Sequence, residues 1–403
     1  MTRTARSRRF ATAASALWIL VTTATVAAQS PADRAERMVR ALVRMGKDAD
    51  TTARFAIEQE MARLHVTGAS VAVVAGGRVV WARGFGVREA NTIAVVDSTT
   101  LFLAGSISKP VFATGVMALV ERGALPLDSN INTLLTSWQL PESRFTEVEK
   151  VTMRRILSHQ AGLTVWGFPG YGAQKPLPTI PQLLDGVAPS NTSAVRNDTT
   201  PGARWLYSGG GITIAQLAVT DRTGEAFPAL MRRLVLDPAG MTRSTFENPL
   251  PAARARDAAS GHEKPDVVVD GKWHVYPEMA AAGLWTTAGD LARWGIAVMQ
   301  SYRGERGALL SPAIAREMLR PQIALPKTGP GAAPAGTWWG LGVQLAGSGR
   351  SFAFQHGGRD EGFVASVAFY PEQDVGIVIL TNATNSAFLG EVGRAFRREF
   401  LSP

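Results

Sequence analysis

The chain has 403 residues, enough for one large domain or two, with a formal net charge of +9 and no cysteine. The lack of cysteine excludes disulfides, thiolate metal sites and a cysteine nucleophile. Four arginines lie within the first nine residues, and the remaining positive excess is small and spread out. Composition therefore does not indicate nucleic-acid binding, and we expect no nucleic-acid partner.

The first 28 residues have the pattern of a secretory signal peptide. A basic stretch over residues 3–9 precedes an apolar, small-residue stretch over 10–26, and Val26-Ala27-Ala28 fits a cleavage site. An uncleaved membrane anchor is the alternative, but the apolar run is short and diluted by Thr and Ala. We expect a periplasmic or secreted protein with no stable membrane span after cleavage.

Helical and strand-like patterns then alternate along the chain. Residues 31–45 and 51–64 show helical patterns, and residues 69–87 form two β-rich runs around Gly76-Gly77, which predicts a hairpin. Residues 101–123 predict a helix buried on nearly all sides. Helical patterns continue through the middle, interrupted over residues 164–204 by a Pro-, Gly- and Asn-rich stretch that could border a cleft.

Strand-like patterns return near the C-terminus, over residues 339–345, 351–356, 362–370 and 376–382, before a last helix over 386–401. We therefore predict an α+β fold, with an antiparallel sheet built from both chain ends, flanked by helices and interrupted by a mostly helical region. The predicted sheet domain is 29–100 with 281–403, and the predicted helical domain is 101–280. The active site is expected in the cleft between them.

Ser106 and Lys109 lie at the start of the apolar helix, three residues apart and so on one face. A serine hydroxyl needs a base to become a nucleophile, and a lysine buried among apolar groups can be that base. Backbone N–H groups at a helix start can also stabilise an oxyanion. Ser-x-x-Lys is common by chance, and a serine at a helix start is usually only a cap, so the pair alone does not establish catalysis.

Two further motifs give the chain a resemblance to a known superfamily. Tyr207-Ser208-Gly209 is similar to a Tyr-x-Asn motif, and His356-Gly357-Gly358 is similar to the His-x-Gly form of a Lys-Thr-Gly motif. With Ser106-Ile107-Ser108-Lys109, they resemble the serine β-lactamase and penicillin-binding-protein superfamily, most of all its class C β-lactamase, D,D-peptidase and carboxylesterase branch.

The resemblance implies a β-lactamase/transpeptidase-like fold and catalysis through an acyl-enzyme. It assigns Ser106 as the acylated nucleophile, with Lys109 and Tyr207 as proton-transfer groups; which of the two is the general base stays open. A phenolate at Tyr207 would need Lys109 close by. His356 stands in for the motif's lysine, and the implied oxyanion hole consists of the N–H groups of Ser106 and Arg359.

The sequence also contains a second match to the third motif, Lys327-Thr328-Gly329. It lies between Pro326 and Pro330, an arrangement that a strand interior excludes. His356-Gly357-Gly358 follows a strand-like run and is the better match. Gly357 and Gly358, together with Gly209, are the predicted substrate-binding positions.

Two departures from the family pattern narrow the expected activity. Gly209 replaces the Asn whose amide contacts the acylamino carbonyl in β-lactamases, and His356 replaces a lysine. We therefore expect a serine hydrolase acting on a small ester, amide or D-amino-acid peptide, with ester cleavage favoured over efficient β-lactam turnover. The alternative is a non-catalytic cell-wall-binding relative. No cofactor or metal is implied, and the sequence does not predict an oligomeric state.

Overall fold

The computed structural model describes residues 1–2, 30–45 and 50–401. The predicted signal peptide lies almost wholly outside these residues, so it stays a prediction. Within the described ranges, no helix combines the length and the apolar character needed to cross a membrane.

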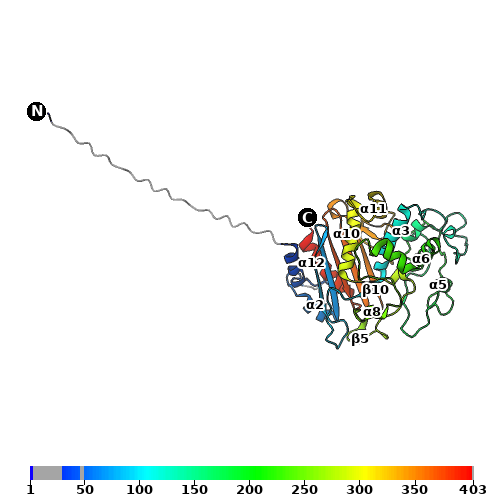
Figure 1. The fold of residues 1–403 in the computed structure, drawn as a ribbon, viewed down its shortest axis with the longest axis horizontal. Coiled ribbons are helices and arrows are strands. Elements are labelled where there is room, and N and C mark those ends of the chain that lie inside the picture. Colours follow the sequence, from blue (N-terminus) through cyan, green and yellow to red (C-terminus); the bar gives the residue numbers. More distant parts are fainter. Residues whose placement is uncertain (3–29, 46–49, 402–403) are drawn as a thin grey trace.

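An eight-stranded antiparallel sheet forms the centre of the molecule (Figure 1). Its strand order is β2-β1-β12-β11-β10-β9-β8-β7, so strands from the N-terminal part pair directly with the strand nearest the C-terminus. This confirms the prediction of one sheet built from both chain ends. Its strands are β1 (Gly68–Ala75), β2 (Arg78–Gly86), β7 (Ile323–Ala324), β8 (Thr337–Trp339), β9 (Gln344–Ala346), β10 (Ala353–Asp360), β11 (Phe363–Tyr370) and β12 (Val375–Thr381).

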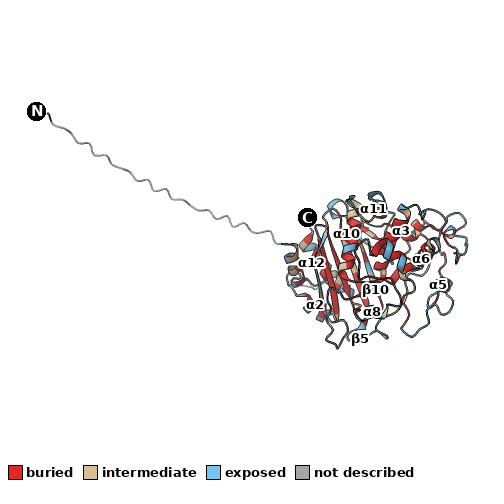
Figure 2. Cartoon of the chain, in the orientation of Figure 1, coloured by how far each residue is buried: buried red, intermediate tan, exposed pale blue. Residues whose placement is uncertain are grey.

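Side chains alternate between two cores on the two faces of the sheet. The central strands are largely coloured as buried in Figure 2. In β1, Val71 and Val73 join the core beneath the terminal helices, whereas Ala72 and Val74 join the larger core on the opposite face. The terminal helices are α1 (Pro31–Arg40), α2 (Ile57–Leu64) and α12 (Ser386–Phe400), and α10 (Ala288–Arg303) covers the opposite face.

The inserted region is mostly helical and lies beside the sheet (Figure 1). Two short strands, β3 (Phe102–Leu103) and β6 (Trp285–Thr286), pair where this region begins and ends; β4 (His262–Lys264) and β5 (Val267–Val268) form a separate pair. The remaining helical elements are η1 (Gly105–Ile107), α3 (Ser108–Glu121), η2 (Ile131–Thr133), α4 (Met153–Leu157), α5 (Ile180–Asp185), α6 (Gly209–Thr223), α7 (Phe227–Met231), η3 (Arg232–Leu236), α8 (Ala252–Ala255), α9 (Met279–Ala282), α11 (Pro312–Met318) and η4 (Gly349–Ser351).

Several predicted boundaries are wrong for local reasons. The helix predicted over 31–45 ends at Arg40, and that predicted over 51–64 begins only at Ile57, because Leu42 and Phe55 exchange backbone hydrogen bonds of 2.9 and 3.1 Å. The strand predicted over 339–345 is split between β8 and β9 by a turn at Gly340–Val343. There Gly342 has a φ of +81°, a conformation that favours glycine.

Candidate active site

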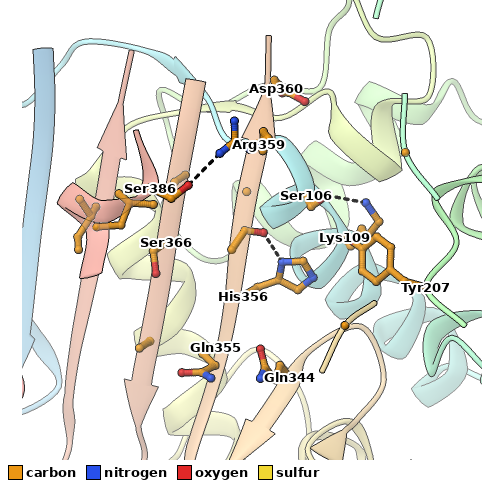
Figure 3. Close-up of a pocket in the computed structure, with 18 of the residues that line it drawn as sticks. Ser106, Lys109, Tyr207, Gln344, Gln355, His356, Arg359, Asp360, Ser366 and Ser386 are labelled. Atoms are coloured by element: carbon orange, nitrogen blue, oxygen red, sulfur yellow. Dashed lines mark hydrogen bonds between the residues drawn. The ribbon is translucent and has the colours of Figure 1, made fainter. Parts of the chain in front are cut away.

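Ser106 lies in the 3₁₀ turn η1, and Lys109 lies in the first turn of α3. The turn is anchored by Ser108, whose hydroxyl donates to Gly105 O at 2.7 Å and accepts from Leu284 N at 2.9 Å. Lys109 Nζ is 2.9 Å from Ser106 Oγ and donates to Ala281 O at 2.7 Å (Figure 3). The Lys109 amine is therefore held next to the Ser106 hydroxyl by contacts with two oxygens, Ser106 Oγ and Ala281 O.

Lys109 is only 2% exposed, and its burial has a direct electrostatic effect. Burial lowers the pKa of the Lys109 amine to about 7, although the nearby carboxyls of Asp360 and Glu278 oppose this shift. A large fraction of the amine is therefore unprotonated near neutral pH. In that state one N–H can bond to Ala281 O while the nitrogen lone pair is free to accept the Ser106 proton.

Glu278 is completely buried, and its carboxyl oxygens find no hydrogen-bond partner in another residue of the described chain. Burial raises the pKa of the Glu278 carboxyl to about 8, and burial also raises the pKa of Asp360 well above its usual range. The Glu278 carboxyl is thus largely neutral at neutral pH, and the pKa of Asp360 is shifted in the same direction. This limits how strongly they can hold Lys109 in its charged form.

Tyr207 is buried beside the Ser106–Lys109 pair (Figure 3). Its position is set by its neighbours in the chain, since Leu206 N donates to His159 O at 2.7 Å and Ser208 N donates to His159 Nδ1 at 3.2 Å. The His159 ring also packs 4.1 Å from the Tyr207 ring, centroid to centroid. His159 therefore positions Tyr207 through hydrogen bonds to both of its neighbours in the chain and through the ring contact.

Burial raises the pKa of the Tyr207 hydroxyl, and a side-chain hydrogen bond with Ser106 only partly opposes this. Lys109 Nζ lies 5.0 Å from the centre of the Tyr207 ring. The hydroxyl is consequently protonated at neutral pH. Of the two proton-transfer candidates, Lys109 has the better match between pKa and ambient pH.

His356 lies in β10, whereas Lys327 lies in the loop between β7 and β8. The structure thus places the histidine, not the lysine, at the site. His356 Nδ1 and Gly357 O are 2.6 Å apart, and burial lowers the pKa of the ring to about 3. The imidazole is neutral at physiological pH and does not carry the positive charge of the lysine that it replaces.

Backbone contact between β10 and η1 brings Arg359 N close to Gly105, the residue before Ser106. A Cβ added to Gly358 would lie 2.0 Å from Ala104 O, and one added to Gly105 would lie 2.5 Å from Arg359 N. Only glycine allows these two segments to approach so closely. The strand predicted over 351–356 is longer in the structure, because Arg359 and Asp360 continue β10. Gly362, with a φ of +78°, makes the bend into β11.

The side chain of Arg359 points away from Ser106 toward α12 (Figure 3). Its Nη2 donates to Thr384 O at 3.1 Å and to Ser386 Oγ at 2.9 Å. The role assigned to this residue is therefore confined to its backbone N–H.

A cavity of about 1270 Å³ opens over Ser106 and extends past the end of β10 to residues of β12 and α12. One wall is strongly aromatic, formed by Trp166, Phe168, Trp205, Tyr207 and Trp339. Part of the stretch over residues 164–204 therefore does border the site. The residues after Lys327-Thr328-Gly329 contribute as well, since Gly331, Ala332 and Ala333 line the cavity.

Phe168 packs against Gly209, the position where the family motif has Asn. A Cβ at Gly209 would lie 2.9 Å from Phe168 Cε2 and 3.2 Å from Trp166 O. Sequence reasoning identified the missing amide but not what fills its place. It also missed Ala281 O, Glu278 and Asp360, because nothing in their local sequence links them to Lys109.

The described residues contain no group of three His, Asp or Glu side chains arranged to hold a metal ion.

Comparisons with known proteins bear on the family and the fold. A family model described as Beta-lactamase matches residues 54–402. The chain is 25% identical over 370 residues to esterase EstB of Burkholderia gladioli, covering 83% of this chain and 90% of that protein. It is also 25% identical over 328 residues to penicillin-binding protein 4 of Amycolatopsis lactamdurans, covering 79% and 81% of the two chains.

Two solved structures have the same fold. A penicillin-binding protein homologue from Pyrococcus abyssi aligns with a TM-score of 0.70 at 23% identity, covering 85% of this chain and 75% of the other. A D-alanine carboxypeptidase from Burkholderia cenocepacia aligns with a TM-score of 0.67 at 20% identity, covering 85% and 96%. The predicted superfamily and fold class are confirmed.

Proposed function

From the premise that the chain belongs to the Beta-lactamase family and is a serine hydrolase of that family, we propose that it cleaves carboxylic esters through an acyl-enzyme on Ser106. The observation that carries the proposal is the 2.9 Å contact between Ser106 Oγ and the buried Lys109 amine at the floor of the cavity. A nucleophile, a base of suitable pKa and an open space for substrate meet at this point.

The proposed acylation step uses four residues. Lys109 takes the proton of Ser106 as Oγ attacks the ester carbonyl, and the N–H groups of Ser106 and Arg359 bind the oxyanion that forms. Tyr207, protonated and adjacent to Ser106, passes its proton to the departing alkoxide, and the Lys109 ammonium returns a proton to the Tyr207 phenolate, so both groups are neutral again. In deacylation, water attacks the acyl carbonyl and gives a proton to Lys109. The ester bond to Ser106 then breaks, Oγ takes the proton back from Lys109, and the acid is released.

Two features favour esters over β-lactams and D-amino-acid peptides. Phe168 fills the place of the amide that would bind an acylamino carbonyl. His356 is neutral because burial lowers its pKa to about 3, so it offers no cation to a substrate carboxylate. A simple ester needs neither contact. The 25% identity to a protein named as an esterase, over 90% of its length, supports the same preference.

The test compares p-nitrophenyl butanoate with nitrocefin, using the wild type and Ser106→Ala. We expect ester hydrolysis with kcat/KM at least 100-fold above that for nitrocefin, and loss of both activities in Ser106→Ala. Efficient nitrocefin turnover with negligible ester cleavage would contradict the ester preference. Absence of any Ser106-dependent hydrolysis would favour the non-catalytic, wall-binding alternative.

A further inference from the structure

The loop over residues 164–172 places two aromatic side chains at the mouth of the cavity. Trp166 is 67% exposed although it is a large apolar residue, and its ring lies 5.2 Å from the Tyr207 ring. Phe168 is half-buried and lines the same cavity. An exposed tryptophan beside a catalytic tyrosine contributes little to the core, so its place calls for another explanation.

The loop is held firmly against the start of α6. Gly209 N donates to Trp166 O at 3.1 Å, Gly210 N donates to Val165 O at 3.0 Å, and Ser208 Oγ donates to Thr164 O at 2.7 Å. Because α6 follows Tyr207 directly, these bonds fix the two aromatic residues relative to the catalytic centre.

Phe168 occupies the space that a side chain at residue 209 would need. Such a side chain would begin 2.9 Å from Phe168 Cε2 and 3.2 Å from Trp166 O, although Gly209 does not have the positive φ that would demand glycine. A side chain at 209 would therefore displace the Phe168 ring. An aromatic surface has replaced a polar contact at this side of the cavity.

The neighbouring rings extend this surface toward the nucleophile. Trp205 lies 5.7 Å and Tyr207 lies 5.8 Å from the Trp339 ring, distances typical of aromatic packing. A planar apolar group can pack edge-to-face or offset against such rings. An amide in the same place would lose its hydrogen bonds to water against an apolar wall.

We propose that Trp166 and Phe168 form an acyl-group subsite that binds aromatic acyl groups of ester substrates and discriminates against acylamino side chains. This inference rests on the proposed ester hydrolysis and narrows its substrate class. The scissile carbonyl lies at Ser106, the acyl chain runs along the aromatic wall, and its terminal ring packs between Phe168 and Trp166.

Three p-nitrophenyl esters with a common leaving group test the subsite. They are the butanoate, the 4-phenylbutanoate, and the N-benzoylglycinate, in which an amide replaces two methylenes of the phenylbutanoate. After correction for hydroxide-catalysed rates, kcat/KM for the 4-phenylbutanoate should exceed the other two by about 10-fold or more.

The variants Trp166→Ala and Phe168→Leu assign the effect to the subsite. Each should lower kcat/KM for the 4-phenylbutanoate by about 5- to 10-fold while changing the butanoate less than 3-fold. Because Trp166 is mostly exposed, Trp166→Ala should keep the Tm of the wild type. Phe145→Ala, an aromatic truncation outside the cavity, serves as the matched control and should change neither ester.

The outcomes separate the inference from the function on which it rests. Equal corrected kcat/KM values for the three esters, or equal losses for butanoate and 4-phenylbutanoate in both variants, would overturn the subsite and leave ester hydrolysis standing. If the wild type cleaved none of the three esters, the proposed function and the subsite would both be wrong.

Discussion

Gly358→Ala is the substitution that most sharply tests the oxyanion hole. The new Cβ would lie 2.0 Å from Ala104 O, and real Cβ atoms essentially never approach closer than 3.0 Å. The obstructing atom is backbone, so β10 and η1 must separate by about 1 Å. This movement carries the Arg359 N–H away from Ser106.

The expected loss follows from the function of the displaced donor. Removing one oxyanion-hole hydrogen bond typically lowers kcat by about 10²–10³-fold, or about 2.7–4 kcal/mol of transition-state stabilisation. Gly357→Ala is the matched control on the neighbouring residue, because a Cβ there meets nothing closer than Ala365 O at 3.9 Å. Gly357 is a predicted substrate-binding position, so the control is read in kcat and not in KM. We expect Gly357→Ala to keep at least a third of the wild-type kcat.

The assay is hydrolysis of p-nitrophenyl butanoate at pH 8, with Tm measured for each protein to establish that it is folded. A folded Gly358→Ala protein with kcat within 3-fold of the wild type would refute the reasoning. So would equal losses in the two alanine variants, because the structure places only one of the two positions against η1.

Three further predictions concern charge and packing. Lys109 must be unprotonated to accept the Ser106 proton and its pKa is about 7, so kcat/KM for ester hydrolysis should rise between pH 6 and 8 with a midpoint near 7. The Lys109→Arg variant should have a kcat/KM lower by at least about 10³-fold, because the guanidinium stays protonated. A pH-independent rate in the wild type would contradict the assignment of Lys109 as the base. The pKa of Glu278 is raised to about 8, so the folded wild type binds one more proton than the unfolded chain and loses stability as pH rises from about 4.5 to 8. The free energy of unfolding of Glu278→Gln relative to that of the wild type, measured by urea titration, should therefore increase by up to about 4 kcal/mol between pH 5 and 8. A difference that stays constant with pH would contradict this prediction. Gly209→Asn should lower Tm by several °C through its clash with Phe168. In the Phe168→Ala background, Gly209→Asn should lower Tm much less than it does in the wild type. Additive Tm changes in the double variant would show that the two positions do not compete for space.

Local patterns in the sequence were enough to predict the elements that carry the catalytic groups. The three-residue spacing from Ser106 to Lys109 lies within one turn, and the Gly76-Gly77 turn lies between alternating strands, so neighbouring residues determine both features. The choice of His356 over Lys327 was equally local, because proline on both sides of Lys327-Thr328-Gly329 argues against a strand.

Features that depend on distant packing could not be predicted. Glu278 acts on Lys109 across 169 positions of the chain, and no periodicity links the two. Gly209 and Phe168 likewise lie 41 positions apart in the sequence, and only the tertiary fold brings them into contact. Helix ends at Arg40 and Ile57 were missed because a backbone pairing between Leu42 and Phe55 competes with helix formation.

The most direct test of the account is the covalent labelling of Ser106. Purified protein would be incubated with a fluorophosphonate, and intact mass and peptide mapping would be recorded for the wild type and for Ser106→Ala. The account predicts one adduct on Ser106 in the wild type and none in the variant. An adduct that persists in Ser106→Ala, or a wild type that stays unmodified while folded, would contradict the claim that Ser106 is the nucleophile.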